Sequence, residues 1–88
     1  MSGKPSLVGI VKQAKEAIVF FEPQKKATGH ILEYKVSGTD NWQQKMINAA
    51  QINNYFLTGL DAKKDYEFRM LTLNENGKSI YSETIKSL

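Results

Sequence analysis

Closely spaced turn signals leave this chain no room for long helices or long strands. Residues that favour turns gather at Glu22-Pro23-Gln24, 37–41, Asn53-Asn54, 59–64 and 74–77. The stretches between them are about as long as ordinary β-strands. The spacing therefore predicts a domain built from short strands joined by turns.

Three of these stretches have the side-chain pattern of strands. Residues 17–21 are β-branched and aromatic, residues 31–36 alternate apolar with polar side chains, and residues 66–70 alternate again. Asn76-Gly77 is the strongest two-residue hairpin signal, because both residues tolerate a positive φ. We therefore expect a hairpin with residues 65–73 on one arm and 78–85 on the other.

Two stretches are ambiguous from pattern alone. Lys12–Ala17 and Trp42–Gln51 are rich in Gln, Lys, Ala and Met, which are good helix formers. The second stretch is long enough for an amphipathic helix of two or three turns, which would give a β-β-α-β-β arrangement. Propensity is a weak guide at this length, so both conformations stay open at this point.

The chain has the size and composition of one small globular domain. It contains 88 residues, of which 41% are hydrophobic and 24% charged. It has no cysteine, so neither a disulfide framework nor a thiolate zinc site can form. No apolar run approaches the roughly 18–20 residues that cross a bilayer, and residues 1–5 show no signal or transit pattern. We expect residues 1–88 to form a single domain, with residues 1–5 as a possible linker.

The positive charge is scattered rather than gathered on one segment. The net charge is +3. Residues 1–44 contain six lysines and four acidic residues, and residues 45–88 contain six basic residues (Lys or Arg) and five acidic residues. Only Lys25-Lys26 and Lys63-Lys64 are adjacent cations. A surface that follows phosphates needs several cations together. We therefore expect no nucleic-acid partner.

The run from Leu57 onward carries a family motif. Leu57-Thr58-Gly59-Leu60-Asp61-Ala62-Lys63-Lys64-Asp65-Tyr66 is followed by Asn74-Glu75-Asn76-Gly77-Lys78-Ser79. These residues resemble the fibronectin type III domain, in which a strand ends at Gly-Leu, a short crossover follows and a Tyr opens the next strand. Upstream, Tyr34-Lys35-Val36 resembles the family's third strand, Trp42 the residue that opens its fourth, and Val19–Pro23 its second. The region from Pro5 to Val11 resembles the first.

The resemblance covers nearly the whole chain and replaces the helical alternative with a strand. It implies an all-β fold, an immunoglobulin-like seven-stranded antiparallel β-sandwich with sheets of three and four strands. In such sandwiches a tyrosine like Tyr66 hydrogen-bonds to the backbone a few residues upstream, and Leu60 would close the bottom of the core beside it. Phe21 stands where the family usually has a tryptophan, so a neighbour must fill the lost volume, and Ala62 stands where it usually has a proline.

The resemblance also assigns side chains to the two faces of the strands. Three apolar residues, Ile18, Phe20 and Phe56, should point outward from neighbouring strands, and Leu71 and Leu73 should point outward from the opposite sheet. We regard Ile18, Phe20 and Phe56 as candidate partner-binding residues, followed by the loops Gln24–His30 and Glu75–Lys78. The alternative is that they form a cross-strand aromatic pair or are covered by lysine stems and chain ends. The core should contain Ala17, Val19, Phe21, Leu32, Tyr34, Val36, Leu57, Tyr66, Phe68 and Met70.

No motif points to catalysis or to a cofactor. His30 is the only histidine, and beside Gly29 at the start of a strand we expect it to be partly exposed. No nucleophile elbow, glycine-rich phosphate loop or zinc-binding helix occurs. The acids are dispersed, and no deep cleft in a domain of this size would hold a pair such as Glu22 with Glu33, or Asp61 with Asp65. We expect no enzyme activity, no metal and no cofactor.

The resemblance implies a non-catalytic protein-interaction and spacer module of a larger multidomain cell-surface or extracellular adhesion or receptor protein. Its partners would be neighbouring domains of the same chain or an unknown protein, with a membrane contacted only through the parent protein, and we expect the isolated domain to be monomeric. Integrin binding is not implied, because the turn Glu75-Asn76-Gly77-Lys78 lacks an Arg-Gly-Asp sequence. One alternative is an intracellular scaffold of a giant muscle-type protein. Another is an accessory domain of a secreted bacterial enzyme or phage tail protein, for which Trp42 and Tyr55 are the plausible carbohydrate platform.

Overall fold

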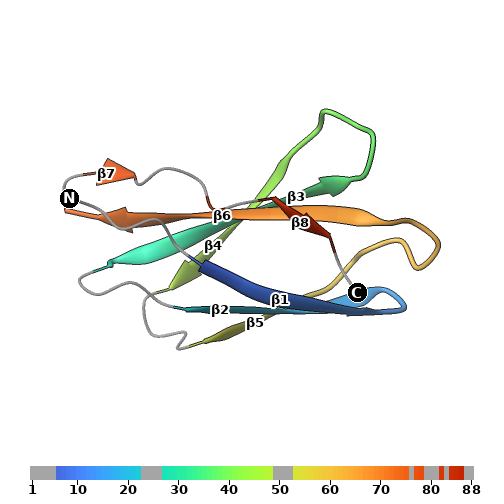
Figure 1. The fold of residues 1–88 in the computed structure, drawn as a ribbon, viewed down its shortest axis with the longest axis horizontal. Helices are drawn as coiled ribbons and strands as arrows, with labels where there is room; N and C mark the ends of the chain where they lie inside the picture. Colours follow the sequence, from blue (N-terminus) through green and yellow to red (C-terminus); the bar gives the residue numbers. More distant parts are fainter. Residues whose placement is uncertain are drawn as a thin grey trace.

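The chain folds into strands that stack in two layers (Figure 1). The computed structural model describes residues 6–22, 27–48, 53–75, 77–78, 82 and 84–86. Within these residues the secondary structure consists of strands and turns. The strands are β1 (Ser6–Gln13), β2 (Glu16–Glu22), β3 (Gly29–Val36), β4 (Gln43–Asn48), β5 (Asn54–Leu57), β6 (Tyr66–Asn74), β7 (Gly77–Lys78) and β8 (Ile85–Lys86).

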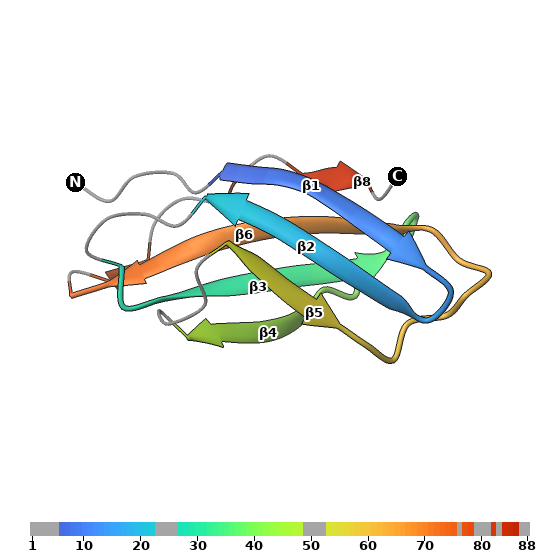
Figure 2. The same cartoon turned by 90° about the horizontal axis from the view of Figure 1, so that it is seen from below.

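The strands form two antiparallel sheets. The first has the order β1-β2-β5, and the second has the order β4-β3-β6-β7, with β8 also paired to β6. Both β7 and β8 pair with β6, so together they take the place of a single seventh strand. The predicted all-β sandwich with sheets of three and four strands is therefore confirmed, and Figure 2 shows the first sheet lying across the second.

The predicted second hairpin arm, residues 78–85, is two short strands in the structure and not one continuous strand. Lys78 pairs with Leu73 and Ile85 pairs with Phe68. These two pairs are seven positions apart on the last arm but five positions apart on β6. The turn is also displaced by one residue from the predicted Asn76-Gly77. Gly77 already pairs with Asn74, so the two-residue connection is 75–76, of which position 76 lies outside the described residues.

The two ambiguous stretches both belong to sheets. Residues 43–48 form β4, the strand that the resemblance implied, so the helical alternative for Trp42–Gln51 is wrong wherever the structure describes it, and residues 49–52 lie outside that part. The six residues of β4 pair with β3 from Gly29 to Tyr34, which outweighs their helix propensity. Lys12–Ala17 forms the β1–β2 hairpin, whose ladder closes at the pair Gln13 and Glu16.

The β1–β2 turn contains a strained residue. Ala14 has a φ of 56°, in the left-handed region where an L-residue with a Cβ is disfavoured by about 1–2 kcal/mol. No glycine, asparagine or proline marks this turn in the sequence, which explains why its pattern looked helical.

Ala14→Gly is therefore expected to stabilise the domain by about 0.5–1 kcal/mol, measured as the change in unfolding free energy in urea. The gain is smaller than the strain because glycine also increases the freedom of the unfolded chain. Ala62→Gly is the matched control, since Ala62 is also exposed in a turn and its φ is not positive. If Ala14→Gly lowers the unfolding free energy as much as Ala62→Gly does, the left-handed conformation of Ala14 does not strain the turn.

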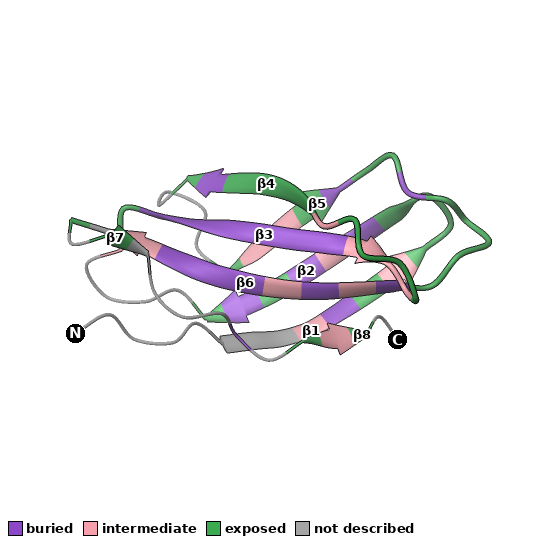
Figure 3. Ribbon diagram, turned by 90° about the horizontal axis from the view of Figure 1, so that it is seen from above, coloured by how far each residue is buried: buried purple, intermediate pink, exposed green. Residues whose placement is uncertain are grey.

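The core lies between the inner faces of the two sheets. Nine of the ten residues predicted to face inward are buried, and the tenth, Val36, is partly buried against the others. Figure 3 shows β3 buried along most of its length, because β4 and β6 pair with it on both sides. Leu60 is buried in the core as the resemblance implied, and the core also contains Ile10 and Ile47, which the pattern did not single out.

The predicted exposure of His30 is wrong, and one outward residue of the second sheet is buried. His30 is 1% exposed rather than a partly exposed surface residue, because it lies on the same inner side of β3 as Leu32 and Tyr34 and packs against Phe21 of the opposite sheet. Leu71 points away from the core as predicted but is 3% exposed, and it lies directly opposite Ile31, which is also buried. Leu73 is partly buried. The outer side of the second sheet is therefore partly covered at this end.

Candidate functional site

The crossover between β5 and β6 is anchored to both sheets. Gly59, with a φ of 80°, ends the extended segment, and the next residue, Leu60, is buried. The Leu60 N–H donates to the Lys15 carbonyl at 3.0 Å, which ties the crossover to the β1–β2 turn. The Asp61 N–H donates to Tyr66 Oη at 2.8 Å. This is the upstream backbone contact expected of Tyr66, so Leu60 and Tyr66 hold the crossover in place.

Tyr66→Phe is expected to lower the unfolding free energy by about 1 kcal/mol or more, because the Asp61 N–H loses its partner. Tyr34→Phe is the matched control, since Tyr34 Oη makes a longer bond of 3.3 Å to Gln43. Both losses can be measured by thermal and urea unfolding. If Tyr66→Phe unfolds like the unchanged chain, this hydrogen bond does not stabilise the crossover.

Phe21 packs against a second ring in the core. The centroids of Phe21 and His30 are 5.2 Å apart with their planes tilted by 54°, and both side chains are buried. His30 comes from the opposite sheet, so it contributes volume beside the position where the family usually has a tryptophan. The imidazole of His30 is the compensating neighbour that the smaller Phe21 requires. This packing gives the buried histidine a structural role.

The outer side of the second sheet carries a charged network. Glu33 is 2% exposed and accepts a hydrogen bond from Arg69 Nε at 2.7 Å and one from Gln44 Nε2 at 2.6 Å. The three residues lie in one cross-strand row of β4, β3 and β6. The carboxylate is thus held by charge-assisted hydrogen bonds and has little free surface for a ligand or a reaction.

Trp42 covers this network. The Arg69 guanidinium lies 4.0 Å from the Trp42 ring centroid, and Lys35 Nζ lies 4.9 Å from it. Such cation–π contacts hold the indole against the sheet. Trp42 is therefore engaged in the fold, and Tyr55 lies on the first sheet, partly buried against the core. Of the two residues proposed as a carbohydrate platform, Trp42 thus packs on the second sheet just before β4, whereas Tyr55 belongs to the first sheet.

The outer side of the first sheet is apolar and exposed. Val11, Ile18 and Phe56 form one cross-strand row of β1, β2 and β5, and Phe20 lies in the adjacent row. Phe56 is 66% exposed, Val11 47% and Phe20 38%, whereas Ile18 is partly buried between its neighbours. We call these four residues the outer apolar face. The register makes Phe20 and Phe56 diagonal neighbours rather than a directly opposed aromatic pair.

The structure places the three predicted partner-binding residues, Ile18, Phe20 and Phe56, together on this face. It also adds Val11, which sequence alone did not single out because its strand was placed only approximately. Of the two candidate loops, residues 24–26 and 76 lie outside the described residues. Thr28 is fixed at the start of β3 by a bond of its N–H to the Leu73 carbonyl at 2.8 Å.

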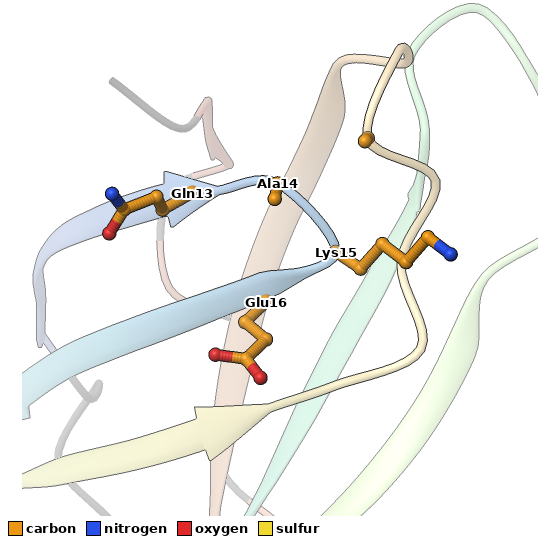
Figure 4. A pocket seen from close by; sticks show the side chains of 5 residues that line it. Gln13, Ala14, Lys15 and Glu16 are labelled. Carbon is orange, nitrogen blue, oxygen red and sulfur yellow. The ribbon is translucent and has the colours of Figure 1, made fainter.

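A pocket of about 490 Å³ lies between the β1–β2 turn and the crossover (Figure 4). It is lined by exposed residues: Gln13, Ala14, Lys15, Glu16 and Ala62. The lining has one carboxylate and one ammonium group and lacks a buried polar group aimed into it, so this open hollow has no built ligand site.

Among the described residues no three His, Cys, Asp or Glu side chains gather as metal ligands. The same part of the chain contains no helix with the length and apolar character of a membrane span.

The fibronectin type III domain family model matches residues 3–87. This chain belongs to the fibronectin type III family. Domains of this family act as interaction and spacer modules and are generally non-catalytic. The match agrees with the arrangement of the sheets and with the Tyr66 contact described above.

Solved structures of this fold superpose closely at low sequence identity. The domain of human contactin 1 has a TM-score of 0.84 and 17% identity, with 99% of this chain and 78% of that chain covered. The domain of the human collagen alpha-1(XX) chain has a TM-score of 0.83 and 17% identity, with coverage of 97% and 82%. A structure of titin kinase and its flanking domains has a TM-score of 0.81 and 19% identity, with 97% of this chain but 16% of that chain covered. These likenesses show the shared fold.

Proposed function

We propose that this fibronectin type III domain is a non-catalytic interaction and spacer module of a larger multidomain cell-surface or extracellular adhesion or receptor protein. The observation that carries the proposal is the outer apolar face. Single exposed apolar residues are ordinary on protein surfaces, but a contiguous group on one sheet is typical of a binding surface. The family match and the likeness to contactin support the proposal.

The face is suited to contact because it lies on a rigid element. Its side chains project from paired strands whose opposite sides are buried in the core, at Ala17, Val19 and Leu57. Binding would therefore require little ordering of the backbone, which lowers the entropic cost of association. Aromatic rings such as Phe56 and Phe20 bury a large apolar area on contact.

A second candidate is an intracellular scaffold domain of a muscle-type protein. It is supported by the likeness to the titin structure, whose TM-score is similar to that of contactin. Both candidates use the same face for contacts with other proteins or with neighbouring domains. They differ in compartment, which localisation of the parent protein in its own cells would distinguish.

Site-directed photo-crosslinking in the parent protein tests the interaction. A photoreactive phenylalanine at Phe56 is expected to give adducts with a partner or a neighbouring domain, whereas the same probe at exposed Asp40, beyond β3, gives none. Phe20→Ser should reduce the adducts at Phe56. Equal adducts at both positions, or none at Phe56, would refute the interaction role of this face.

Replacing both Phe20 and Phe56 with serine is expected to abolish the adducts from a probe at Val11 while leaving a folded domain. The fold survives because both rings lie outside the core. Phe21→Ser is the matched control on the same strand, where loss of a 1% exposed ring is expected to cost about 3 kcal/mol or more. Circular dichroism and urea unfolding check both variants. If the double variant is as unstable as Phe21→Ser, the outer face belongs to the core.

A further inference from the structure

The outer apolar face is bounded by two carboxylates. The side chains on the outer side of β2 are Glu16, Ile18, Phe20 and Glu22, in that order, with the glutamates at the two ends. Both glutamates are exposed, and neither has a salt bridge to another described residue. The apolar centre is thus flanked along the strand by negative charge.

The neighbouring strands add no cation to this side of the sheet. In register with the four β2 residues, β1 has Gln13, Val11, Gly9 and Ser6, and in register with Ile18 and Phe20, β5 has Phe56 and Asn54. Lys15 lies in the β1–β2 turn and extends toward the crossover (Figure 4). The described part of this face is therefore acidic, although the whole chain has a net charge of +3.

This charge pattern disfavours a second copy of the chain as the occupant. Two copies stacked through this face in an antiparallel orientation would bring Glu16 of one near Glu22 of the other. A parallel orientation would bring each glutamate near its own counterpart. Both arrangements place like charges together at the rim of an apolar contact, which is unfavourable. A partner with cations at the corresponding positions would instead be attracted.

The spacing of the glutamates defines the complementary element. Glu16 and Glu22 are six positions apart on one strand, which corresponds to about 20 Å at the usual rise per residue. A strand on a facing sheet has the same rise, and stacked sheets align their strands within about 30°. A strand with two apolar side chains between cations at its first and seventh positions therefore matches the face.

We infer that the outer apolar face docks a sheet of another protein or domain that presents a strand of the pattern cation-x-apolar-x-apolar-x-cation. The inference rests on the proposed function, because it names the chemistry of the partner for that same face. Apolar contact with Phe20, Phe56, Ile18 and Val11 would supply most of the affinity. Glu16 and Glu22 would set the partner's charge and its alignment along β2.

Two β-hairpin peptides test this inference. In the basic hairpin both strands read Lys-Thr-Leu-Thr-Leu-Thr-Lys and are joined by Asn-Gly, and in the acidic hairpin every Lys is replaced by Glu. Titrations followed by backbone amide NMR shifts are expected to show the basic hairpin bound to β1, β2 and β5. Its dissociation constant should be about tenfold lower than that of the acidic hairpin, with the difference reduced by salt.

Charge reversal on the protein provides the decisive control. Glu16→Lys with Glu22→Lys is expected to invert the preference so that the acidic hairpin binds more tightly. Asp40→Lys with Glu75→Lys changes the net charge by the same amount away from this face, and it should leave the preference in place. If both double variants invert the preference to the same extent, the net charge of the protein decides which hairpin binds and the inference is wrong.

The remaining outcomes separate this inference from the proposed function. If both hairpins bind the face equally and Phe56→Ser weakens both, the face is an interaction surface but its glutamates do not select the partner. If the shifts map to the other sheet, or if neither hairpin binds at millimolar concentration, the inference is wrong. The crosslinking experiment in the parent protein then decides the proposed function independently.

Discussion

Replacing Arg69 with methionine is expected to lower the unfolding free energy by about 3–5 kcal/mol, the usual cost of removing one member of a buried ion pair. Glu33 is 2% exposed, and its carboxylate accepts the 2.7 Å hydrogen bond from Arg69 Nε. Gln44 would still donate to the other carboxylate oxygen. A neutral amide, however, does not compensate the charge as the guanidinium does.

Methionine is the informative replacement because its unbranched stem still covers the carboxylate. Alanine would open a path for water to Glu33, so part of the electrostatic cost would be lost and a packing cost added. The arginine also stacks on Trp42, with its guanidinium carbon 4.0 Å from the ring centroid. A share of the loss would therefore come from that contact.

Urea unfolding followed by circular dichroism measures this effect. Fluorescence of Trp42, the only tryptophan, reports the local change. Lys45→Met is the control, since it removes an exposed cation from neighbouring β4 and should change stability little. The double variant Glu33→Gln with Arg69→Met should recover at least half of the loss, because no buried charge remains. If this double variant is as unstable as Arg69→Met, the loss comes from packing on Trp42 and not from the carboxylate.

The inner faces of the strands could be predicted from the sequence because alternation and the family motif both define them. Leu32, Tyr34 and Val36 alternate with polar residues, and the Gly59-Leu60 to Tyr66 spacing fixes the crossover. A strand with two paired neighbours and one core-facing side leaves only one register that buries these residues. The outward positions of Ile18, Phe20 and Phe56 follow from the same register.

The local pattern is silent or misleading at three places, although the resemblance already implied a strand after Trp42. The turn at Ala14 uses a residue that rarely adopts a positive φ, and β4 is composed of helix formers held extended by pairing with β3. Burial of Glu33 on the outer side of its sheet depends on Arg69 and Trp42, which are distant in sequence. Tertiary contacts of this kind override local propensity. The candidate binding residues were thus predictable as a group, whereas the charged network was not.

His30 is expected to make the stability of the fold depend on pH, because burial lowers the pKa of its imidazole below the ordinary value of about 6.5. Both ring nitrogens are buried without a hydrogen-bond partner among the described residues, and one face of the ring packs on Phe21. Its strand partners are Ile47 on β4 and Thr72 on β6, so no charged side chain in register offsets the burial.

The domain should therefore lose stability as the pH falls. Below about pH 6.5 the unfolded chain takes up a proton at His30 that the folded chain resists, so the unfolding free energy decreases on acidification until the pH reaches the lowered folded pKa. Above about pH 6.5 both states carry neutral imidazole and this contribution is fully present. Carboxylates titrate mainly at lower pH, which leaves the interval between pH 7.5 and 5 sensitive to this side chain.

Replacing His30 with leucine is expected to raise stability at pH 7 by about 1–3 kcal/mol, since a side chain of similar size then fills the site without unpartnered polar atoms. The same variant should remove most of the pH dependence between pH 7.5 and 5, which urea unfolding at several pH values would measure. Phe21→Leu is the control, because it disturbs the same ring contact but keeps the imidazole and so should keep the pH dependence. If His30→Leu and the unchanged chain lose stability equally on acidification, another group causes the loss. If His30→Leu is less stable at pH 7, the contact of the imidazole with Phe21 outweighs the cost of burying its nitrogens.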